Sequence, residues 1–317
     1  MENVRGAEPE WIGRDPALLA ARARLKIAAP SALPVLVLGE TGTGKELAAR
    51  TVHAGSDSAA GPFLALNCGA LPDGLIESEL FGAGRGAYTG AVERAGLVEA
   101  AEGGTLFLDE IGDAGPQFQM KLLRLLDGAP GDGEFRRLGE ARTRRARTRI
   151  VAATHHDLPR AVREGRFRAD LWYRLAAIEV TLPPLRARGE DVLLLARAFL
   201  ARGRPGMWLG PDARAVVRQY TWPGNVRELA QAMAHAAVFA GTDGVVGVDA
   251  LPARITRALD AGDAVDAPVT LEAELAGLEA ARIEQALSEA GGNCSRAARR
   301  LGLSRQGLWR KLKRRAP

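Results

Sequence analysis

The sequence predicts an α/β fold in three parts: a core on a mostly parallel sheet, a helical subdomain and a small all-α C-terminal domain. Up to about Leu182, short β-rich runs alternate with helical patterns, which is typical of parallel strands joined by helices. After Pro183-Pro184 the apolar spacing is helical. A stretch rich in Ala, Asp, Gly and Pro, from about Leu259 to Val269, is expected to be a linker before the basic tail.

The elements of the core are expected to be short. The expected strands are Val35–Leu38, Phe63–Leu66, Thr105–Leu108, Arg149–Ala153 and Ile178–Leu182. The helical patterns between them are Lys45–His53, Leu75–Leu80, Gln117–Leu126 and Leu158–Glu164. Further helices are expected at Asp191–Ala201, Pro211–Tyr220, Val226–Phe239 and Leu271–Ala290. The Gly-rich segment Asp127–Gly133 is expected to be an enlarged surface loop without a role.

The composition excludes several classes of protein. The chain has 317 residues, of which 47% are hydrophobic and 26% charged, so two or three folded domains fit. No apolar run approaches the roughly 18 residues of a membrane span, and Met1–Glu10 lacks the apolar segment of a signal peptide. The two cysteines, Cys68 and Cys294, are far apart and predict neither a disulfide framework nor a metal cluster. We therefore expect a cytoplasmic protein without a membrane partner.

The positive charge is concentrated at the C-terminus. From Arg282 to Pro317 there are ten Lys or Arg and two Glu, a net charge of +8 in a chain whose total is +5. Such a concentration is typical of a module that binds nucleic acid, and a solvated basic face is the alternative.

A glycine-rich segment between an expected strand and an expected helix has the pattern of a phosphate-binding loop. Its residues are Gly39, Glu40, Thr41, Gly42, Thr43, Gly44, Lys45 and Glu46. Glycines let the backbone N–H groups point at phosphates, the helix N-terminus adds partial positive charge, and Lys45 would reach the β- and γ-phosphates. The segment therefore predicts ATP binding. The general motif ends in Ser or Thr, a Mg²⁺ ligand, and Glu46 stands in that place.

Two adjacent acids follow the expected strand Thr105–Leu108. Asp109 would hold Mg²⁺, directly or through water, and Glu110 would orient or deprotonate the attacking water. An apolar run that ends in two acids is a weak signal alone. Downstream of a phosphate loop in the same α/β unit, it predicts an ATPase.

The basic tail contains the pattern of a helix-turn-helix. Two short helices, around Ser295–Leu301 and Ser304–Arg314, are separated by the turn Gly302-Leu303. The second helix would enter the major groove of double-stranded DNA, with Arg and Gln near base edges and the lysines near phosphates. Its expected DNA-binding residues are Ser304, Arg305, Gln306, Arg310, Lys311 and Lys313. Trp309 is expected to pack against the preceding helix, and contact with DNA is the alternative.

Three further motifs complete the pattern. Glu77–Gly82 leads into a glycine-flanked hexapeptide, Phe167–Arg174 contains two arginines, and Trp222–Leu229 opens a helix. Together with the phosphate loop and the paired acids, they resemble the AAA+ ATPase domain of bacterial enhancer-binding proteins, which activate the sigma-54 form of RNA polymerase. The tail is similar to the Fis-type domain that ends many of these proteins. The resemblance covers nearly the whole chain, from about Ile12.

The resemblance implies further site residues. The hexapeptide would be a mobile loop that contacts sigma-54, with Tyr88 where the family usually has Phe; its residues are Gly86, Ala87, Tyr88, Thr89, Gly90 and Ala91. Asn67 would hydrogen-bond the catalytic Glu110. Thr154 would sense the γ-phosphate, although His155 follows it where the family usually has Asn. The implied arginine fingers, acting on a neighbouring subunit's ATP, are Arg168 and Arg174, and the implied second sensor is Arg227.

The resemblance also sets the expected domains. They are a short extension (1–10), an AAA+ α/β ATPase subdomain (11–182), a helical lid subdomain (183–256), a linker (257–270) and a Fis-type helix-turn-helix domain (271–317). The short segment before Trp11 leaves two sources of input open: a separate regulatory protein that acts on the ring, or a sensory domain missing by truncation.

The function that we expect is sigma-54-dependent activation of transcription. The protein would bind upstream DNA as a dimer, assemble into a ring, expected to be a hexamer, and use ATP hydrolysis with Mg²⁺ to remodel the closed complex of sigma-54 RNA polymerase. Two alternatives stay open: a DNA-binding regulator whose ATPase is vestigial or serves only assembly, and an AAA+ remodeller of another partner.

Overall fold

The computed structural model describes residues 9–84, 87, 92–241, 244–260, 296, 298, 300 and 301. The chain divides into two units, 1–260 and 261–317, which are described separately.

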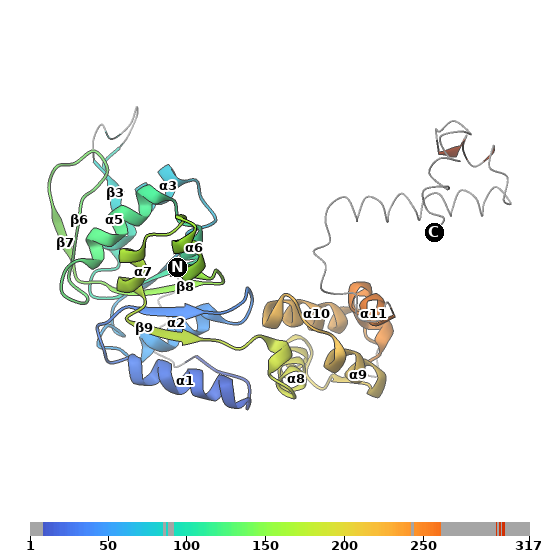
Figure 1. Ribbon diagram of the computed structural model, residues 1–317. Helices are drawn as coiled ribbons and strands as arrows, with labels where there is room; N and C mark the ends of the chain where they lie inside the picture. Colours follow the sequence, from blue (N-terminus) through green and yellow to red (C-terminus); the bar gives the residue numbers. More distant parts are fainter. Residues whose placement is uncertain are drawn as a thin grey trace. The chain divides into compact units, whose positions relative to one another are not determined.

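A sheet of five parallel strands forms the centre of the α/β subdomain (Figure 1). The strands are β1 Val35–Leu38, β2 Phe63–Asn67, β5 Thr105–Asp109, β8 Arg149–Thr154 and β9 Ile178–Thr181. Their order is β2-β5-β8-β1-β9, so β8 lies between β5 and β1. The predicted parallel sheet is confirmed. Because parallel strands end at the same edge, this order brings the segments that follow β1, β5 and β8 together.

Helices cover both faces of the sheet. Those of the α/β subdomain are α1 Pro16–Ala28, α2 Lys45–Ala54, α3 Asp73–Phe81, α4 Leu97–Ala100, the 3₁₀ turn η1 Ile111–Asp113, α5 Pro116–Leu126, α6 Leu158–Arg163 and α7 Ala169–Leu175. Alternate strand residues face opposite layers. Val35, Val37 and Phe107 pack in a cluster with α1 and α2, whereas Leu106 and Leu108 pack with α5 and α7.

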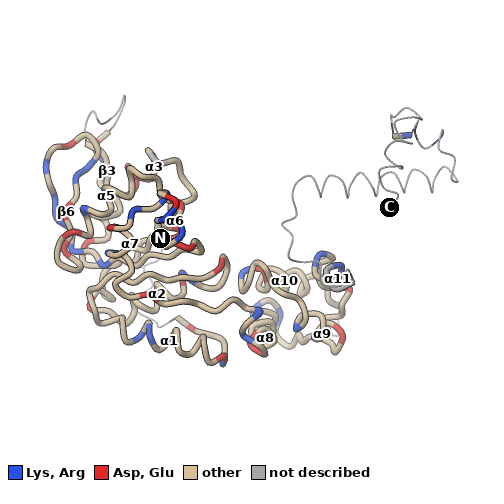
Figure 2. Tube along the Cα trace, viewed as in Figure 1, with Lys and Arg blue, Asp and Glu red and all other residues tan. Residues whose placement is uncertain are grey.

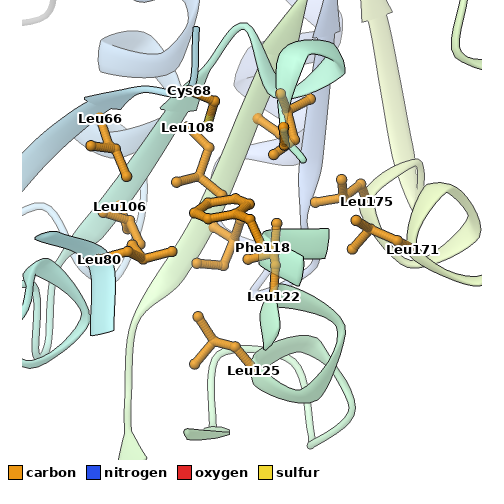
Figure 3. Close-up of a cluster of buried hydrophobic side chains, with 14 of the residues drawn as sticks. Leu66, Cys68, Leu80, Leu106, Leu108, Phe118, Leu122, Leu125, Leu171 and Leu175 are labelled. Atoms are coloured by element: carbon orange, nitrogen blue, oxygen red, sulfur yellow. The ribbon is translucent and has the colours of Figure 1, made fainter. Parts of the chain in front are cut away.

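The second of these clusters is dense and apolar. Figure 3 shows Phe118 and Leu122 of α5 between the strand residue Leu108 and the α7 residues Leu171 and Leu175. These five side chains are all fully buried. Burying an aliphatic or aromatic side chain of this size contributes about 1.5–3 kcal/mol each, which anchors the end of β5 to α7.

Helix α1 was not predicted, although its start has a clear signal. The carboxylate of Asp15 accepts a hydrogen bond from the N–H of Leu18 at 3.0 Å, and Pro16 occupies the first turn. At the other end the buried guanidinium of Arg149 donates to the carbonyls of Ala28 and Ala29, which satisfies acceptors at the helix terminus. Burial lowers the pKa of Arg149 to about 10.

Two antiparallel hairpins, also unpredicted, project from this subdomain. One pairs β3 Gly82–Ala83 with β4 Arg94–Ala95, and the other pairs β6 Gly133–Phe135 with β7 Arg144–Ala146. Leu138 joins them, since its carbonyl accepts from Gly84 N–H at 2.8 Å. The last residue of the expected loop Asp127–Gly133 is the first residue of β6. Figure 2 shows Lys and Arg along the second hairpin.

The lid subdomain is built mainly of helices. Its elements are η2 Leu185–Ala187, α8 Asp191–Gly203, β10 Trp208–Leu209, α9 Pro211–Gln219, α10 Asn225–Phe239, β11 Val245–Val246, η3 Val248–Ala250 and α11 Ala253–Asp260. The prediction of an all-helical region was wrong in one respect, because β10 pairs with β11. Two-residue strands are too short to show a period of two. Helix α11 also occupies 253–260, so the first residues of the expected linker are helical.

Little of the second unit is described. Arg296, Ala298 and Arg300 are helical, and Ala298 is buried. The expected helix Leu271–Ala290 and the recognition helix lie outside the described residues. In the described part of the chain, no helix combines the length and the apolar character needed to cross a membrane.

Candidate active site

The phosphate loop, Gly39–Glu46, connects β1 to α2. Gly42 and Gly44 have φ angles of 81° and 103°, which side chains other than glycine rarely adopt. A Cβ atom on Gly42 would also overlap the carbonyl oxygen of Gly224 in the lid. The buried hydroxyl of Thr43 donates to the carbonyl of Glu40 at 2.7 Å. The loop is therefore held in one conformation by its own contacts and by the lid.

Lys45 is buried at the start of α2. Its ammonium group donates to the carbonyl of Gly39 at 3.0 Å and pairs with Glu110 Oε1 at 3.1 Å. Lys45 thus points across the loop toward the end of β5, which is where a phosphate-binding lysine must lie.

The two acids at the end of β5 have different environments. Asp109 accepts a hydrogen bond from the N–H of Glu110 at 3.1 Å, and burial, with the neighbouring charge of Glu110, raises the pKa of Asp109. Glu110 has a φ of 52°, in the left-handed region. Burial acts to raise the pKa of Glu110, but the hydrogen bond from His155 and the charge of Lys45 lower it overall. Glu110 is therefore stabilised as a carboxylate.

The end of β8 contributes Thr154 and His155. The carbonyl of Thr154 accepts from the N–H of Gly39 at 3.2 Å, and its buried hydroxyl accepts from the N–H of His156 at 3.0 Å. His155 lies against Glu110: its Nδ1 is 2.6 Å from Glu110 Oε2, and its N–H donates to the same oxygen at 3.2 Å. Sequence reasoning noted His155 as a departure from the family pattern but missed this contact.

Asn67 makes a different contact from the one expected. Its side-chain oxygen accepts a hydrogen bond from the N–H of Gly69 at 2.9 Å. The two carboxylate oxygens of Glu110 bond Lys45 and His155. Among the described residues, no hydrogen bond joins Asn67 to Glu110, and the turn after β2 uses only the Asn67 side-chain oxygen.

The two glutamates of the phosphate loop both pair with arginines outside the loop. Glu46 is more than half exposed and pairs with Arg50 at 2.7 Å, one turn along α2. Glu40 forms two hydrogen bonds with Arg186, at 2.6 and 2.7 Å, and these hydrogen bonds lower the pKa of Glu40. Glu46 is thus engaged in a surface ion pair.

A lid residue without a predicted role joins the loop to the lid. Asn225 is completely buried at the start of α10. Its amide donates to Glu40 Oε2 at 3.1 Å and to the carbonyl of Thr41 at 3.0 Å. Its oxygen accepts from the N–H of Leu185 at 2.7 Å. Arg227 follows, and its backbone N–H donates to the carbonyl of Gly42 at 3.3 Å. The lid therefore contacts the phosphate loop directly.

The residues present suit a Mg²⁺–nucleotide complex. Among the described residues, no group of three or more His, Cys, Asp and Glu could hold a metal ion by itself. Mg²⁺ in nucleotide sites typically uses one or two carboxylates together with phosphates and water, and Asp109 offers one carboxylate beside the phosphate loop. Burial of Asp109 without a cationic hydrogen-bond partner is consistent with such a role.

Arg168 and Arg174 lie on the surface around α7. Arg168 pairs with Asp170 at 2.8 Å, and Arg174 with Asp127 at 3.1 Å. Both side chains are nearly half exposed. The buried amide of Gln119 fixes the segment before α7, because it accepts from the N–H of Arg168 at 2.9 Å and donates to the carbonyl of Arg166 at 3.0 Å. Both arginines are thus accessible to a neighbouring molecule.

Several predicted site residues are outside the described part of the chain. In the expected sigma-54 loop these are Gly86, Tyr88, Thr89, Gly90 and Ala91. In the expected recognition helix they are Ser304, Arg305, Gln306, Arg310, Lys311 and Lys313. Ala87 is described, and its N–H donates to the carbonyl of Gly84 at 3.3 Å.

Family models account for most of the chain. Residues 11–181 match the sigma-54 interaction domain. The chain belongs to the sigma-54 interaction domain family. Within this family member, residues 186–267 match the AAA+ ATPase lid domain, and residues 274–314 match the Fis family of bacterial regulatory proteins. The resemblance found in the sequence is confirmed, as is the fold class.

Several proteins that are similar to this chain are transcription regulators. The chain is 44% identical to the nitric oxide reductase transcription regulator NorR2 of Cupriavidus necator, over 94% of this chain and 61% of the relative. It is 43% identical to the transcriptional regulatory protein ZraR of Klebsiella oxytoca, over 96% of this chain and 68% of the relative. The chain spans about three fifths of the length of the first three such relatives.

A solved structure has the same fold. NtrX from Brucella abortus in complex with ATP matches with a TM-score of 0.73 and 33% identity, over 97% of this chain and 70% of that one. RuvB from Thermotoga maritima, at 14% identity and a TM-score of 0.52, shares the fold. The family member thus has an AAA+ α/β core with a helical lid.

Proposed function

We propose that this protein activates transcription by hydrolysing ATP in a ring of identical subunits and remodelling the closed complex of sigma-54 RNA polymerase. One observation carries the proposal. The phosphate-binding Lys45, the paired acids Asp109 and Glu110 and the lid contact at Gly42 converge at one edge of the sheet. This arrangement occurs in a chain of the sigma-54 interaction domain family.

The residues of this edge divide the chemistry of ATP hydrolysis. Backbone N–H groups of the phosphate loop and Lys45 would bind the phosphates. Mg²⁺ would be held by Asp109 and would neutralise phosphate charge. The Glu110 carboxylate, kept ionised by its neighbours, would orient the attacking water and accept its proton. Thr154 and Arg227 would report the state of the γ-phosphate.

Other parts of the chain would use the energy of hydrolysis. Arg168 and Arg174 would complete the site of the adjacent subunit, since both are accessible. The loop Gly86–Ala91, flanked by the paired strands β3 and β4, would contact sigma-54. The helix-turn-helix would hold the ring on upstream double-stranded DNA in the cytoplasm.

Transcription in vitro tests this function. The template is a supercoiled plasmid with a site found by sequencing the genomic DNA that the protein retains. We expect open-complex formation by sigma-54 RNA polymerase to require this protein and ATP, and a non-hydrolysable analogue to fail. Thr89→Ala should retain ATPase activity and lose open complexes. Activation that survives Thr89→Ala would show that the loop does not act on sigma-54.

A DNA-binding regulator with a vestigial ATPase is a second candidate. One observation favours it, because both oxygens of Glu110 are engaged, by Lys45 and by His155. Phosphate release by the purified protein at increasing concentration distinguishes the two candidates. ATP binding without turnover at any protein concentration would support the vestigial site and overturn the activator.

A further inference from the structure

The catalytic acid is held from two sides. Glu110 is mostly buried, and Lys45 bonds its Oε1 at 3.1 Å. His155 bonds its Oε2 twice, through Nδ1 at 2.6 Å and through its backbone N–H at 3.2 Å. One oxygen of the carboxylate therefore contacts Lys45 of the phosphate loop, and the other contacts His155, which lies outside that loop.

Bound ATP would affect the contact of Glu110 with Lys45 but not the contact of Glu110 with His155. Lys45 would bind the phosphates, so its bond to Glu110 competes with the nucleotide for the same ammonium group. His155 directly follows β8 and bonds Oε2 of Glu110, whereas Lys45 bonds Oε1, so the bond from His155 does not use the phosphate-binding ammonium group. When Lys45 turns to the nucleotide, His155 is the partner that can continue to orient the carboxylate.

His155 is itself held by rigid neighbours. It directly follows Thr154, which is completely buried and accepts from the phosphate loop at Gly39. Its ring packs on the ring of His156, with centroids 4.1 Å apart. His156 in turn bonds Asp113 Oδ1 at 2.7 Å through Nε2. Two histidines thus connect the end of β8 to the segment after β5: His155 bonds Glu110, and His156 bonds Asp113.

The alternative partner is engaged elsewhere. Asn67 would be the residue for this role by resemblance, but its side-chain oxygen accepts from the N–H of Gly69 at 2.9 Å. In the described part of the chain, its side chain forms no hydrogen bond with Glu110. The imidazole of His155, by contrast, is already at hydrogen-bond distance from the acid.

We propose that His155 is the positioning residue of the catalytic glutamate: it fixes Oε2 of Glu110, so that Oε1 is directed to accept the proton of the attacking water. In this role it takes the part that the family pattern gives to Asn67. The inference rests on the proposed ATPase function and deepens it. For a hydrogen bond to the carboxylate, Nδ1 must carry the proton and Nε2 must not, if the ring is neutral.

Three variants of the 317-residue chain test the proposal. His155→Ala removes the side-chain bond, His155→Asn restores a donor of N–H, and His235→Ala is a control that removes an exposed histidine of the lid. We expect His155→Ala to lower kcat at least about tenfold while the Kd for a fluorescent ATP analogue stays within about twofold. His155→Asn should recover about a third or more of the wild-type kcat, and His235→Ala should match wild type.

Other results would overturn the inference. One is a His155→Ala variant that retains more than half of the wild-type kcat. Another is a parallel loss of ATP binding and kcat in both His155 variants, since a merely structural residue would behave in that way. Nitrogen NMR of the His155 ring, in protein without added nucleotide, is an independent readout. The Nδ1–H tautomer supports the contact, and the Nε2–H tautomer contradicts it. If the wild-type protein hydrolyses no ATP, the proposed function is wrong. The NMR measurement would still test the contact between His155 and Glu110.

Discussion

Lys45 and Glu110 form an ion pair across the phosphate loop, with Nζ of Lys45 3.1 Å from Oε1 of Glu110. The pair joins the residue that would bind phosphate to the residue that would activate water. Both side chains are largely buried, so their mutual attraction is screened less than that of a surface pair. A bound nucleotide would therefore compete with Glu110 for the ammonium group of Lys45.

The first prediction concerns this competition. Glu110→Gln removes the negative charge, so Lys45 is released for phosphate, and we expect ATP affinity to be equal to or higher than that of wild type. Hydrolysis should fall about 100-fold or more, because an amide cannot accept the proton. Fluorescent-nucleotide titration and phosphate release measure the two effects. The matched variant Lys45→Ala should lose binding itself. A Glu110→Gln protein with weakened ATP binding would contradict the competition.

The second prediction concerns the contact between lid and phosphate loop. Asn225→Ala leaves the buried N–H of Leu185 without its acceptor and removes two bonds to the loop. It also puts alanine at a φ of 52°. We expect a loss of about 2–3 kcal/mol in the free energy of unfolding and weaker ATP binding. Urea denaturation and nucleotide titration measure both.

Asn225→Gly is the control for backbone strain. It loses the same hydrogen bonds but adopts a positive φ without cost, so it should be more stable than Asn225→Ala by about 1 kcal/mol. Equal stability of the two variants would mean that the strain is relieved elsewhere. An Asn225→Ala protein that binds ATP like wild type would separate the lid contact from the nucleotide site.

The strands and the phosphate loop could be predicted because their signals are local. Aliphatic runs that end in glycines or acids mark β1 and β5, and each predicted strand ends within one residue of the observed end. The strand order could not be predicted in this way. The position of β8 between β5 and β1 depends on which apolar faces meet in the folded chain, and the periodicity of a strand does not record its neighbours.

The contacts of the site were harder to predict than its residues. Lys45, Asp109 and Glu110 belong to motifs with fixed spacing, and the structure brings them together. His155 and Asn225 act through partners more than 40 residues away, at Glu110 and at the phosphate loop. These partners depend on the order of strands in the sheet and on the contact between the lid and the phosphate loop. A local sequence pattern predicts neither.

The third prediction concerns Arg137, which lies in the segment between β6 and β7. Arg137 is nearly buried and bonds both oxygens of Glu99, at 2.7 and 2.8 Å, together with Glu93 at 3.0 Å. We expect Arg137→Ala to cost about 2 kcal/mol of unfolding free energy at pH 7, since the acids lose their charge-assisted bonds. The neighbouring Arg136 is exposed, and its side chain donates to the hydroxyl of Thr143, so Arg136→Ala should change stability by less than about 0.5 kcal/mol.

The same pair predicts a dependence on pH. The hydrogen bond from Arg137 lowers the pKa of Glu99 from its ordinary value of 4.5. A lowered pKa means that the stabilisation is complete above the ordinary value and is lost as the pH falls through the lowered one. The gap in stability between wild type and Arg137→Ala should therefore be constant from pH 7 to 6 and shrink below about pH 4.5. Urea denaturation at each pH measures the gap, and a gap that widened in acid would contradict the assignment.

The last prediction concerns action between subunits. Arg168 and Arg174 are exposed, and in the described part of the chain they pair with Asp170, Asp127 and the carbonyl of Leu126, none of which belongs to the phosphate loop. If they complete a neighbour's site, Arg174→Ala should bind ATP normally and hydrolyse it about 1,000-fold more slowly. Arg166→Ala, which removes a nearby exposed arginine paired with Glu164, should behave like wild type.

Mixing two inactive variants tests whether the arginine acts in trans. Lys45→Ala cannot bind ATP but still presents Arg174, and Arg174→Ala binds ATP but lacks the finger. In a mixed ring, some interfaces join an intact nucleotide site to an intact arginine, so the mixture should regain hydrolysis that neither variant has alone. The regained rate should rise with total protein concentration, because assembly creates the active interfaces. If Arg174 acts within its own subunit, the mixture should regain no ATP hydrolysis at any ratio of the two variants or any protein concentration. If the rate of ATP hydrolysis per subunit of the wild type does not depend on protein concentration, the ring is not the active form.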